Sequence, residues 1–542
     1  MAKYFILNIV LSCSLIFSNI IKPSYGDTLN YIDVLVGWNQ VQDAGSYRLE
    51  VFNDEDSLIY SVIDSSLNVV LSDNFDWSGS YYINLFAIKN DSSNEILIES
   101  DHIFYTASLP EVEILPFTTN IINESQYYAG YNFIDYLVID KYSKVIFFTP
   151  QVNNARFGFM NQLDNGYLLG IGYGSIGGVI IDLDGNFIYQ TSSEIGDVHH
   201  DFQPMGNGNF LGLVRGSVIA EIPNGAWDNQ LQENGIFNLR WQYDDIVEFD
   251  NLGNEVWRWS TNDYFSKQDF NENWFNVSQA INNSNGSTPK FDWTHCNAIF
   301  YDGNESVIYL SCRHLSRIIK IGYPEGNIIW MIGEDMPSGE VYLGDEIDIS
   351  SQHAIKVLNN GNLMLFDNGN YNDPVLSRCL EFQIENDGNE FIFNKIWEHV
   401  LPVEYYSSKL GDCDRLPNGN SLLASGAIGY SLEVNQNNDL IWENISNFED
   451  HGSGNFPAYS SFYRAERIDG LYPLIFSVTI DNFKDSLGVK YIYIPTGESY
   501  FKFSIENEGD KNYKYQYNIS DNLGLVEYYG ETNIIENEKL EI

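Results

Sequence analysis

The sequence predicts an all-β protein: a six-bladed β-propeller, preceded by an N-terminal β-sandwich domain and followed by a small C-terminal β-rich extension. Two observations support this prediction. Aromatic residues make up 15% of the 542 residues and lean to Tyr and Phe, which favour strands. Between residues 116 and 477, apolar strands and turn residues alternate in repeated pairs of hairpins, a pattern typical of propeller blades.

The N-terminus has the pattern of a leader. Residues 1–26 combine a basic start, an apolar run up to Ile21 and small residues before a cleavage site at residue 26, which predicts a signal peptide. A second interpretation is a lipoprotein signal ending at Cys13, but the apolar run continues beyond that cysteine. We therefore expect a periplasmic or secreted protein with no membrane span.

The formal net charge of −47 excludes one class of partner. An acidic surface repels the phosphate backbone, so we expect no nucleic-acid partner. The Asp and Glu residues are scattered through loops, which indicates a solvated acidic exterior.

Three folded regions follow the leader. Residues 27–115 alternate strands such as 46–52 and 81–87 with turns, and this pattern resembles fibronectin type III modules. Residues 116–477 form the predicted propeller, and residues 478–542 are a polar, strand-rich tail without a chemical motif.

Turn glycines define the repeat within the propeller. Asn-Gly and similar turns between apolar strands predict hairpins centred near Gly166, Gly208, Gly303, Gly361 and Gly419. These hairpins start five blades. Strands from residues 136–149 and 460–477, at opposite ends of the region, are expected to combine into the sixth and so remove free sheet edges. Residues 217–243 and 262–291 are insertions expected to rim a site.

The turn glycines also provide an internal register. The residues eight positions before them are Gly158, His200, His295, His353 and Gly411. The chain has only eight histidines, so three at equivalent positions indicate a site. Because the first strand of each blade lines the central channel, we expect these imidazoles to converge.

The second strand of each hairpin adds further candidates. The positions facing the first set are Arg215, Arg313, Asn368 and Gly426. Arg215 is either a site residue or a charge that balances the surface. The register also sets Cys296 opposite Cys312, as a cross-strand disulfide or as two buried free thiols.

Imidazole and guanidinium groups together favour an anion. Arginine offers a planar fork to tetrahedral oxyanions, and a neutral imidazole can attack sulfur. Three histidines also suit zinc or copper, but neighbouring cations disfavour a metal and no carboxylate is in register. We therefore expect neither metal nor cofactor.

The other histidines are given lesser roles. His199 should face away from His200 and support it at most. The remaining four are out of register and are expected at the surface: His102, His314, His399 and His451.

Several ordered motifs resemble bacterial arylsulfate sulfotransferases. They are His199-His200-Asp201, residues 292–297, residues 310–313, residues 351–354 and residues 463–467. The resemblance implies a six-bladed propeller that moves a sulfuryl group from a phenolic sulfate donor to a phenol acceptor, without the nucleotide donor PAPS. It also implies a ping-pong reaction through a sulfated histidine.

The resemblance assigns roles by motif. His353 corresponds to the nucleophile, while His200, His295 and Arg313 correspond to residues that bind sulfate and stabilise the transition state. Asn297 matches a further site position, and we expect His295 to protonate the leaving phenolate. Members are often periplasmic homodimers. This chain departs from the family in lacking its short disulfide loop and in carrying the 478–542 tail.

Two alternatives remain. A non-catalytic propeller binding sulfated glycans or other anions would use the same Arg and His side chains. A metal-dependent hydrolase or lyase would use the histidines as ligands.

Overall fold

The computed structural model shows an all-β protein. It describes the chain except residues 1–4, 9–17, 91–93, 110–116, 151–156, 173–175, 226, 284–287, 335, 338–347, 387–390, 447–460, 482, 487–488, 493–501, 510, 521–526, 536–537 and 542. Cys13 and His451 lie outside the described residues. Among the described helices, none has both the length and the apolar character needed to cross a membrane.

Within the described residues, the region from 117 to 468 contains six antiparallel sheets. Four of them follow chain order: β14 (Phe157–Gln162), β15 (Leu168–Gly172), β16 (Gly177–Ile181) and β17 (Phe187–Gln190); β18 (Val198–Pro204), β19 (Phe210–Glu221), β20 (Asn238–Phe249) and β21 (Glu255–Ser260); β23 (Cys296–Asp302), β24 (Val307–Cys312), β25 (Arg317–Gly322) and β26 (Ile328–Gly333); β27 (His353–Val357), β28 (Leu363–Asp367), β29 (Arg378–Asn386) and β30 (Phe391–Val400).

The other two sheets combine distant segments. One contains β13 (Val145–Phe148), β12 (Leu137–Ile139), β11 (Tyr131–Ile134) and β35 (Ala465–Ile468); the other contains β31 (Asp412–Arg415), β32 (Ser421–Ser425), β33 (Tyr430–Val434), β34 (Leu440–Ser446) and β10 (Phe117–Ile121). Because β35 pairs antiparallel with β11, the predicted joining of the two ends of this region is confirmed.

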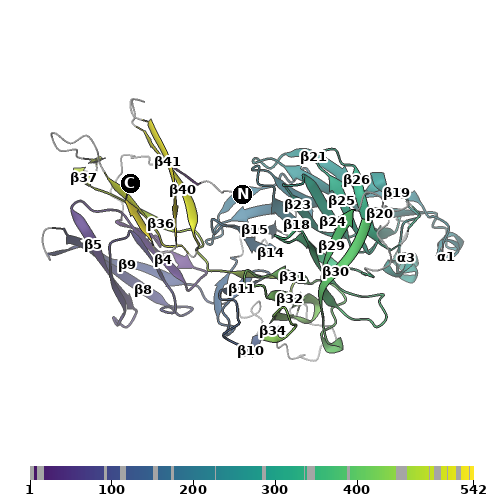
Figure 1. Ribbon diagram of the computed structural model, residues 1–542, viewed down its shortest axis with the longest axis horizontal. Helices are drawn as coiled ribbons and strands as arrows, with labels where there is room; N and C mark the ends of the chain where they lie inside the picture. Colours follow the sequence, from purple (N-terminus) through teal and green to yellow (C-terminus); the bar gives the residue numbers. More distant parts are fainter. Residues whose placement is uncertain are drawn as a thin grey trace.

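These sheets lie together in one lobe of the molecule (Figure 1), and contacts between neighbouring sheets join them in a closed ring. Strands of adjacent sheets touch in sequence: β11 with β14, β15 with β18, β18 with β23, β23 with β27, β27 with β31, and β32 with β35. Strands β18, β23, β27 and β31, each the first of its sheet along the chain, therefore lie side by side. This arrangement brings side chains from separate sheets to one centre.

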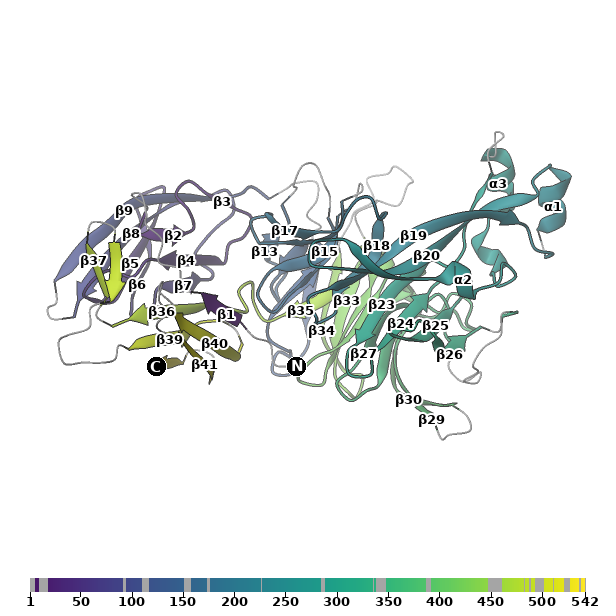
Figure 2. The same ribbon diagram turned by 90° about the horizontal axis from the view of Figure 1, so that it is seen from above.

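The predicted insertions extend the ring at one end (Figure 2). The hairpin of β19 and β20 runs out from its sheet and carries α1 (Asp228–Glu233). The second insertion contains α2 (Thr261–Tyr264), η1 (Glu272–Trp274) and α3 (Val277–Asn283), followed by β22 (Lys290–Asp292), which pairs parallel with β20. The short helices η2 (Val403–Tyr405) and η3 (Gly426–Ile428) lie between ring strands.

A second lobe contains the strands that precede the ring and those that follow it (Figure 1). Its N-terminal sheets are β3 (Thr28–Leu29), β9 (Glu95–Thr106), β8 (Ser80–Lys89), β5 (Ala44–Asn53) and β6 (Leu58–Asp64), and then β2 (Ile20–Lys22), β4 (Val34–Trp38) and β7 (Asn68–Leu71). They share one apolar core, to which Trp38 and Phe104 contribute.

The folded lobe starts before the predicted leader boundary. Strand β2 pairs with β4, and Ile20 is buried. The backbone N–H of Asn19 donates to Glu99 Oε2 at 2.9 Å, and His102 Nε2 lies 2.9 Å from the carbonyl oxygen of Pro23. Cleavage at residue 26 would remove this strand. His102, expected at the surface, is fully buried because these residues cover it.

The C-terminal strands pack beside the N-terminal lobe. They are β36 (Phe476–Ile480), β39 (Phe503–Asn507) and β42 (Lys539–Glu541); β37 (Phe483–Ser486) and β38 (Val489–Ile492); and β40 (Tyr513–Ser520) and β41 (Glu527–Ile534) with β1 (Phe5–Asn8). Gln40 Nε2 donates to the carbonyl oxygen of Ile480 at 2.9 Å, and Lys484 Nζ lies 2.7 Å from Asp43 Oδ1. The tail is thus joined to the N-terminal lobe rather than independent of it.

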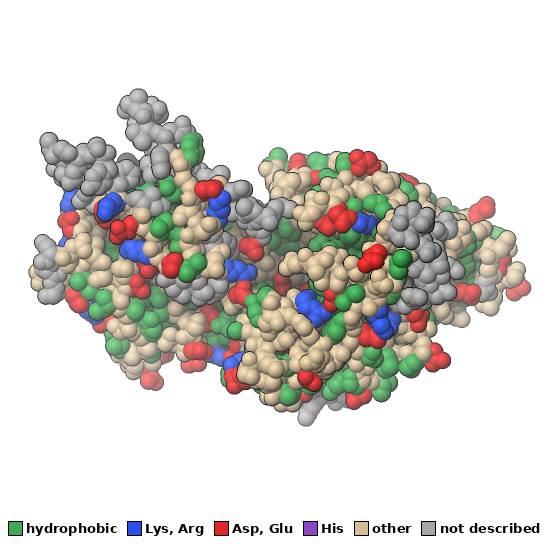
Figure 3. Space-filling view, viewed as in Figure 1, with side chains coloured by type: hydrophobic (Ala, Val, Ile, Leu, Met, Phe, Trp, Pro, Cys, Tyr) green, Lys and Arg blue, Asp and Glu red, His purple; other side chains and the backbone are tan. Residues whose placement is uncertain are grey.

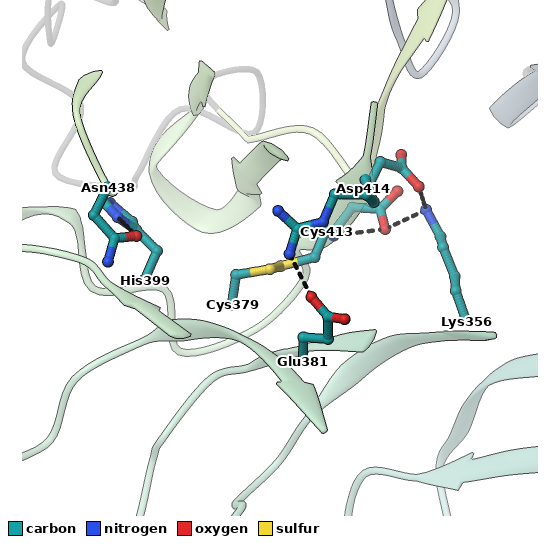
Figure 4. Close-up of a disulfide and its surroundings, with 9 residues drawn as sticks. Lys356, Cys379, Glu381, His399, Cys413, Asp414 and Asn438 are labelled. Carbon is teal, nitrogen blue, oxygen red and sulfur yellow. Dashed lines mark hydrogen bonds and ion pairs between the residues drawn. A yellow bond between two sulfur atoms is a disulfide. The ribbon is translucent and has the colours of Figure 1, made fainter. Parts of the chain in front are cut away.

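The disulfide lies at a pair of cysteines that the sequence analysis had not singled out. A disulfide joins Cys379 on β29 to Cys413 on β31 and so links two neighbouring sheets (Figure 4). Cys296 and Cys312 face each other in register, with sulfur atoms 3.0 Å apart, but they are buried free thiols. The cross-strand register is therefore confirmed. Of the two alternatives for this pair, a disulfide or two buried free thiols, the structure contains the free thiols.

Candidate active site

Three inner strands share the same irregularity near their first residues. The pairing register of β18 shifts after His199, that of β23 after Cys296 and that of β27 after His353. Left-handed backbone accompanies each shift, with φ of 59° at His200, 46° at His295 and 56° at Ala354. Non-glycine residues rarely adopt this conformation, and bulges of this kind re-aim side chains beside functional sites.

The three histidines beside these bulges belong to one continuous row of six aromatic rings. Consecutive ring centroids are 4.1 Å apart for Trp274 and His314, 4.3 Å for His314 and His295, 4.8 Å for His295 and His200, 5.7 Å for His200 and Tyr463, and 6.2 Å for Tyr463 and His353. The expected convergence of His200, His295 and His353 is therefore confirmed.

Hydrogen bonds define the tautomer of His353, which is buried. Its Nδ1 lies 2.6 Å from Asn368 Oδ1. The Asn368 amide nitrogen donates to the carbonyl oxygens of Ser407 at 2.7 Å and Leu410 at 2.9 Å, so its oxygen must face the imidazole. Nδ1 therefore carries the proton. The lone pair is on Nε2, which accepts from the backbone N–H of Leu410 at 3.3 Å.

Burial and nearby cations keep two imidazoles neutral. Burial lowers the pKa of His353 well below its usual value, and the positive charge of Arg313 lowers it further. Burial also lowers the pKa of His200, with additional effects from His199 and His295. A neutral His353 keeps an electron pair on Nε2, and in this structure that pair accepts from the Leu410 N–H.

Arg313 is held rigidly beside these rings. Its Nη1 donates to His314 Nε2 at 2.9 Å, and its Nη2 donates to the carbonyl oxygen of Ser408 at 3.0 Å. The guanidinium carbon lies 4.2 Å from the centre of the Trp274 ring. Its buried Nε has no partner among the described residues, so this donor is available to an anion. The predicted pairing with His295 is confirmed, because the Arg313 backbone N–H donates to its carbonyl at 3.1 Å.

An aspartate orients His295. Asp292 Oδ2 lies 2.6 Å from His295 Nδ1, and this hydrogen bond holds the pKa of the carboxyl group below its usual value although burial opposes it. A carboxylate on Nδ1 leaves Nε2 to exchange protons. Asp292 lies outside the repeat register, so the register could not reveal that a carboxylate contacts His295.

His314, which was expected at the surface, lies inside the site. It is buried, and its Nδ1 donates to the backbone oxygen of Asp292 at 2.7 Å. Burial lowers its pKa to about 3, so His314 stays neutral and accepts from Arg313. His399, also expected at the surface, is half-buried beside Asn438.

A further layer supports these residues. His199 Nε2 lies 3.0 Å from Asp244 Oδ1, and its ring centroid lies 5.0 Å from that of His200. Asp244 Oδ2 accepts from Thr294 Oγ1 at 2.6 Å and from the backbone N–H of Cys296 at 2.7 Å. These bonds connect the sheets that carry His200 and His295, which is a supporting role.

The three residues predicted to bind substrate lie in three different environments. Asn297 is fully buried, and its Nδ2 donates to the carbonyl oxygen of Gln352 at 2.8 Å. Asn368 contacts His353 rather than an open cavity. Arg215 is exposed on β19, and its charge helps to lower the pKa of His200.

The structure adds Tyr463 and Arg464, which precede β35. Tyr463 Oη lies 3.1 Å from His200 Nδ1. Arg464 Nη2 lies 3.2 Å from Asp201 Oδ2 and 3.3 Å from the carbonyl oxygen of Asn297. Their place in an ordered motif was the available signal, because neither falls in the repeat register.

Among the described residues, one cluster has three metal-ligand side chains: Asp292, His295 and His314, with ligand atoms within 4.8 Å of one another. Both ring nitrogens of His314 are engaged, one by Arg313 and the other by a backbone carbonyl. A guanidinium 2.9 Å away disfavours a second cation at this place. The donor set fits a hydrogen-bonded network better than a metal.

Fold and site together define a closed ring of antiparallel sheets with an imidazole and guanidinium centre suited to an oxyanion. The chain belongs to the arylsulfotransferase (ASST) family, whose model matches residues 135–455. No curated protein matches the sequence.

Solved structures show only a distant likeness. A protein of unknown function from Bacteroides caccae is 10% identical, with 62% of this chain and 98% of that chain covered and a TM-score of 0.34. A streptogramin B lyase is 11% identical over 61% and 88% of the chains, with a TM-score of 0.34. Virginiamycin B lyase from Staphylococcus aureus is 10% identical over 60% and 88%, with a TM-score of 0.30. At these scores the likeness carries no argument about function.

Proposed function

We propose that this protein is a PAPS-independent aryl sulfotransferase built on a six-bladed β-propeller, and that it works by a ping-pong mechanism through a sulfohistidine at His353. The observation that carries this proposal is the state of His353. Its Nδ1 is engaged by Asn368, burial and the Arg313 charge keep the ring neutral, and the lone pair is on Nε2, which a substrate would reach by displacing the Leu410 N–H.

The first half-reaction forms an N–S bond. The lone pair of His353 Nε2 attacks the sulfur of an aryl sulfate while the bond from sulfur to the phenolic oxygen breaks. The electron pair of that bond leaves on the phenolate, which takes the Nε2 proton of His295; His295 enters this step as the imidazolium, paired through Nδ1–H with Asp292, and leaves it neutral. The positive charge that develops on the sulfated imidazole is stabilised through Nδ1 by Asn368 Oδ1.

The second half-reaction reverses the roles. The acceptor phenol gives its proton to His295, its oxygen attacks the sulfur, and the N–S electron pair returns to His353. Asp292 stabilises the protonated form of His295 in both steps, since its carboxylate accepts from Nδ1. No cofactor is needed to balance either step.

Arg313 and His200 supply the anion site. The rigid guanidinium fork offers Nε and its charge to the sulfuryl oxygens, whose charge is redistributed in the transition state. His200 contributes to the same anion site from the adjacent sheet, and its ring lies 4.8 Å from that of His295. Arg215 contributes positive potential at the rim.

Covalent labelling tests the proposal. After incubation with 4-nitrophenyl sulfate, mass spectrometry of the peptide containing His353 should show one added sulfuryl group, and an acceptor phenol should discharge it. His353→Ala should abolish both labelling and transfer, while His399→Ala, on the outer strand β30, serves as the control. An unlabelled, inactive wild-type protein that still binds sulfated sugars would instead indicate the glycan-binding alternative.

A further inference from the structure

A separate cavity of about 590 Å³ lies beside the histidine centre. One wall is the parallel pair of β20 and β22, in which Arg240 lies next to Lys290 and Gln242 next to Asp292. Trp274 and other residues of the second insertion form the opposite wall. The size lies within the range of small-molecule sites, which is about 300–1,000 Å³.

The two cations of this cavity are unusual in a chain with a net charge of −47. Arg48, Arg258 and Arg378 each contact a carboxylate. In contrast, the structure records no ion pair for Arg240 or Lys290 among the described residues. Side chains of like charge on adjacent strands repel each other, and a bound anion would relieve that repulsion.

The cavity adjoins the reacting groups through two shared residues. Asp292 lines it and also holds His295 Nδ1 at 2.6 Å. Trp274 lines it and also packs against Arg313, 4.2 Å from the guanidinium carbon, and against the ring of His314. A molecule in the cavity is therefore one side chain away from the sulfuryl-transfer centre.

The geometry points to a specificity subsite for phenolic substrates that carry an anionic substituent, such as a carboxylate, and this inference rests on the proposed function. Arg240 and Lys290 bind the substituent. The apolar faces of Trp274 and Phe275 pack against the aromatic part. The phenolic oxygen then points towards His295. Neutral phenols use the same centre without the charge contacts.

Acceptor selectivity tests the inference. The double variant Arg240→Gln/Lys290→Gln keeps side-chain length and removes both charges. With 4-nitrophenyl sulfate as donor, kcat/KM for 4-hydroxybenzoate should fall 10-fold to 100-fold, whereas kcat/KM for 4-methylphenol should change less than twofold. Lys395→Gln, an exposed lysine on β30, should leave both values unchanged. An unaltered ratio between the two acceptors in the double variant would overturn the subsite.

Direct binding separates this inference from the proposed function. Calorimetric titration of 4-hydroxybenzoate into the wild type should show binding that the double variant loses, whether or not sulfuryl transfer is observed. Absence of transfer and labelling with every substrate would contradict the proposed function alone. Equal binding of 4-hydroxybenzoate by both proteins, or no binding by the wild type, would contradict the subsite alone.

Discussion

The Nδ1 atom of His353 lies 2.6 Å from Oδ1 of Asn368, and both side chains are buried. Two backbone carbonyls fix the amide, so this single contact determines which imidazole nitrogen carries the lone pair. The amide thus sets the tautomer of His353, which we propose as the nucleophile.

Replacing Asn368 with Ala should slow sulfation of His353 about 100-fold, since the wrong tautomer becomes accessible and the developing charge loses its acceptor. The KM for the donor should change little, because Asn368 does not face the anion. Rapid-quench measurement of the labelled peptide checks this. Asn360→Ala, in an exposed turn, is the control, and an unchanged labelling rate for Asn368→Ala would contradict the tautomer argument.

The lowered pKa of His353 predicts that the rate of covalent labelling does not fall as the pH drops below neutral. Burial and Arg313 disfavour the imidazolium, so the nucleophile stays neutral as the pH falls from 8 to 6. An imidazole with the usual pKa of about 6.5 would lose about fourfold in neutral fraction over this range. We expect the labelling rate with 4-nitrophenyl sulfate to stay constant. A fourfold decline centred near 6.5 would mean that His353 titrates normally.

Asp292→Asn should affect poor leaving groups most. The amide retains an acceptor for His295 but loses the charge that stabilises its protonated form. Labelling by phenyl sulfate, whose phenolate needs a proton, should fall about 100-fold or more, while labelling by 4-nitrophenyl sulfate should fall less than 10-fold. Equal losses for the two donors would show that His295 does not protonate the leaving group.

Glu466 on β35 should make stability depend on pH. Burial raises its pKa to about 7, with Asp414 nearby adding to the shift. A raised pKa stabilises the fold fully below the unfolded value of about 4.5, and this contribution is lost as the pH rises through 7. Glu466→Gln should therefore raise stability at pH 8 by about 1–3 kcal/mol and leave it unchanged at pH 4. Thermal unfolding at both pH values, with the exposed Glu325→Gln as control, measures this difference.

The cysteines should divide into one linked and one free pair. Alkylation under denaturing, non-reducing conditions should modify Cys296 and Cys312, and peptide mapping should recover the peptides of Cys379 and Cys413 joined. Replacing Cys379 and Cys413 with Ser should lower stability by about 2–4 kcal/mol. Recovery of a Cys296–Cys312 link would contradict the assignment.

The parts of the site that follow the repeat were predictable from the sequence. Asn-Gly turns set the register, and this register was enough to bring His200, His295 and His353 together and to set Arg313 beside His295. A bulge adds one residue to a strand, and the alternation of apolar and polar residues does not reveal it. Arg215 and Asn368 were therefore both predicted to bind substrate, although Arg215 lies at the rim and Asn368 supports His353.

The insertions were not predictable in the same way. Trp274 belongs to a segment with no counterpart in other sheets, and His314 follows Arg313 at a turn, outside the register. Likewise, residues 19–23 cover His102. Their apolar pattern had placed these residues in the predicted leader, so the burial of His102 was not foreseen. Contacts between distant segments determine where such residues lie, and the local sequence contains little information about those contacts.

The position of Tyr463 and Arg464 just before β35 has a consequence for how the enzyme matures. A nascent chain presents His200, His295 and His353 long before residues 463–468 are synthesised, and until then the first sheet has an unpaired edge that favours aggregation. Under the proposed mechanism, the site is complete only once residues 463–468 have joined β11. Truncated chains that end before Tyr463 should therefore lack transfer activity.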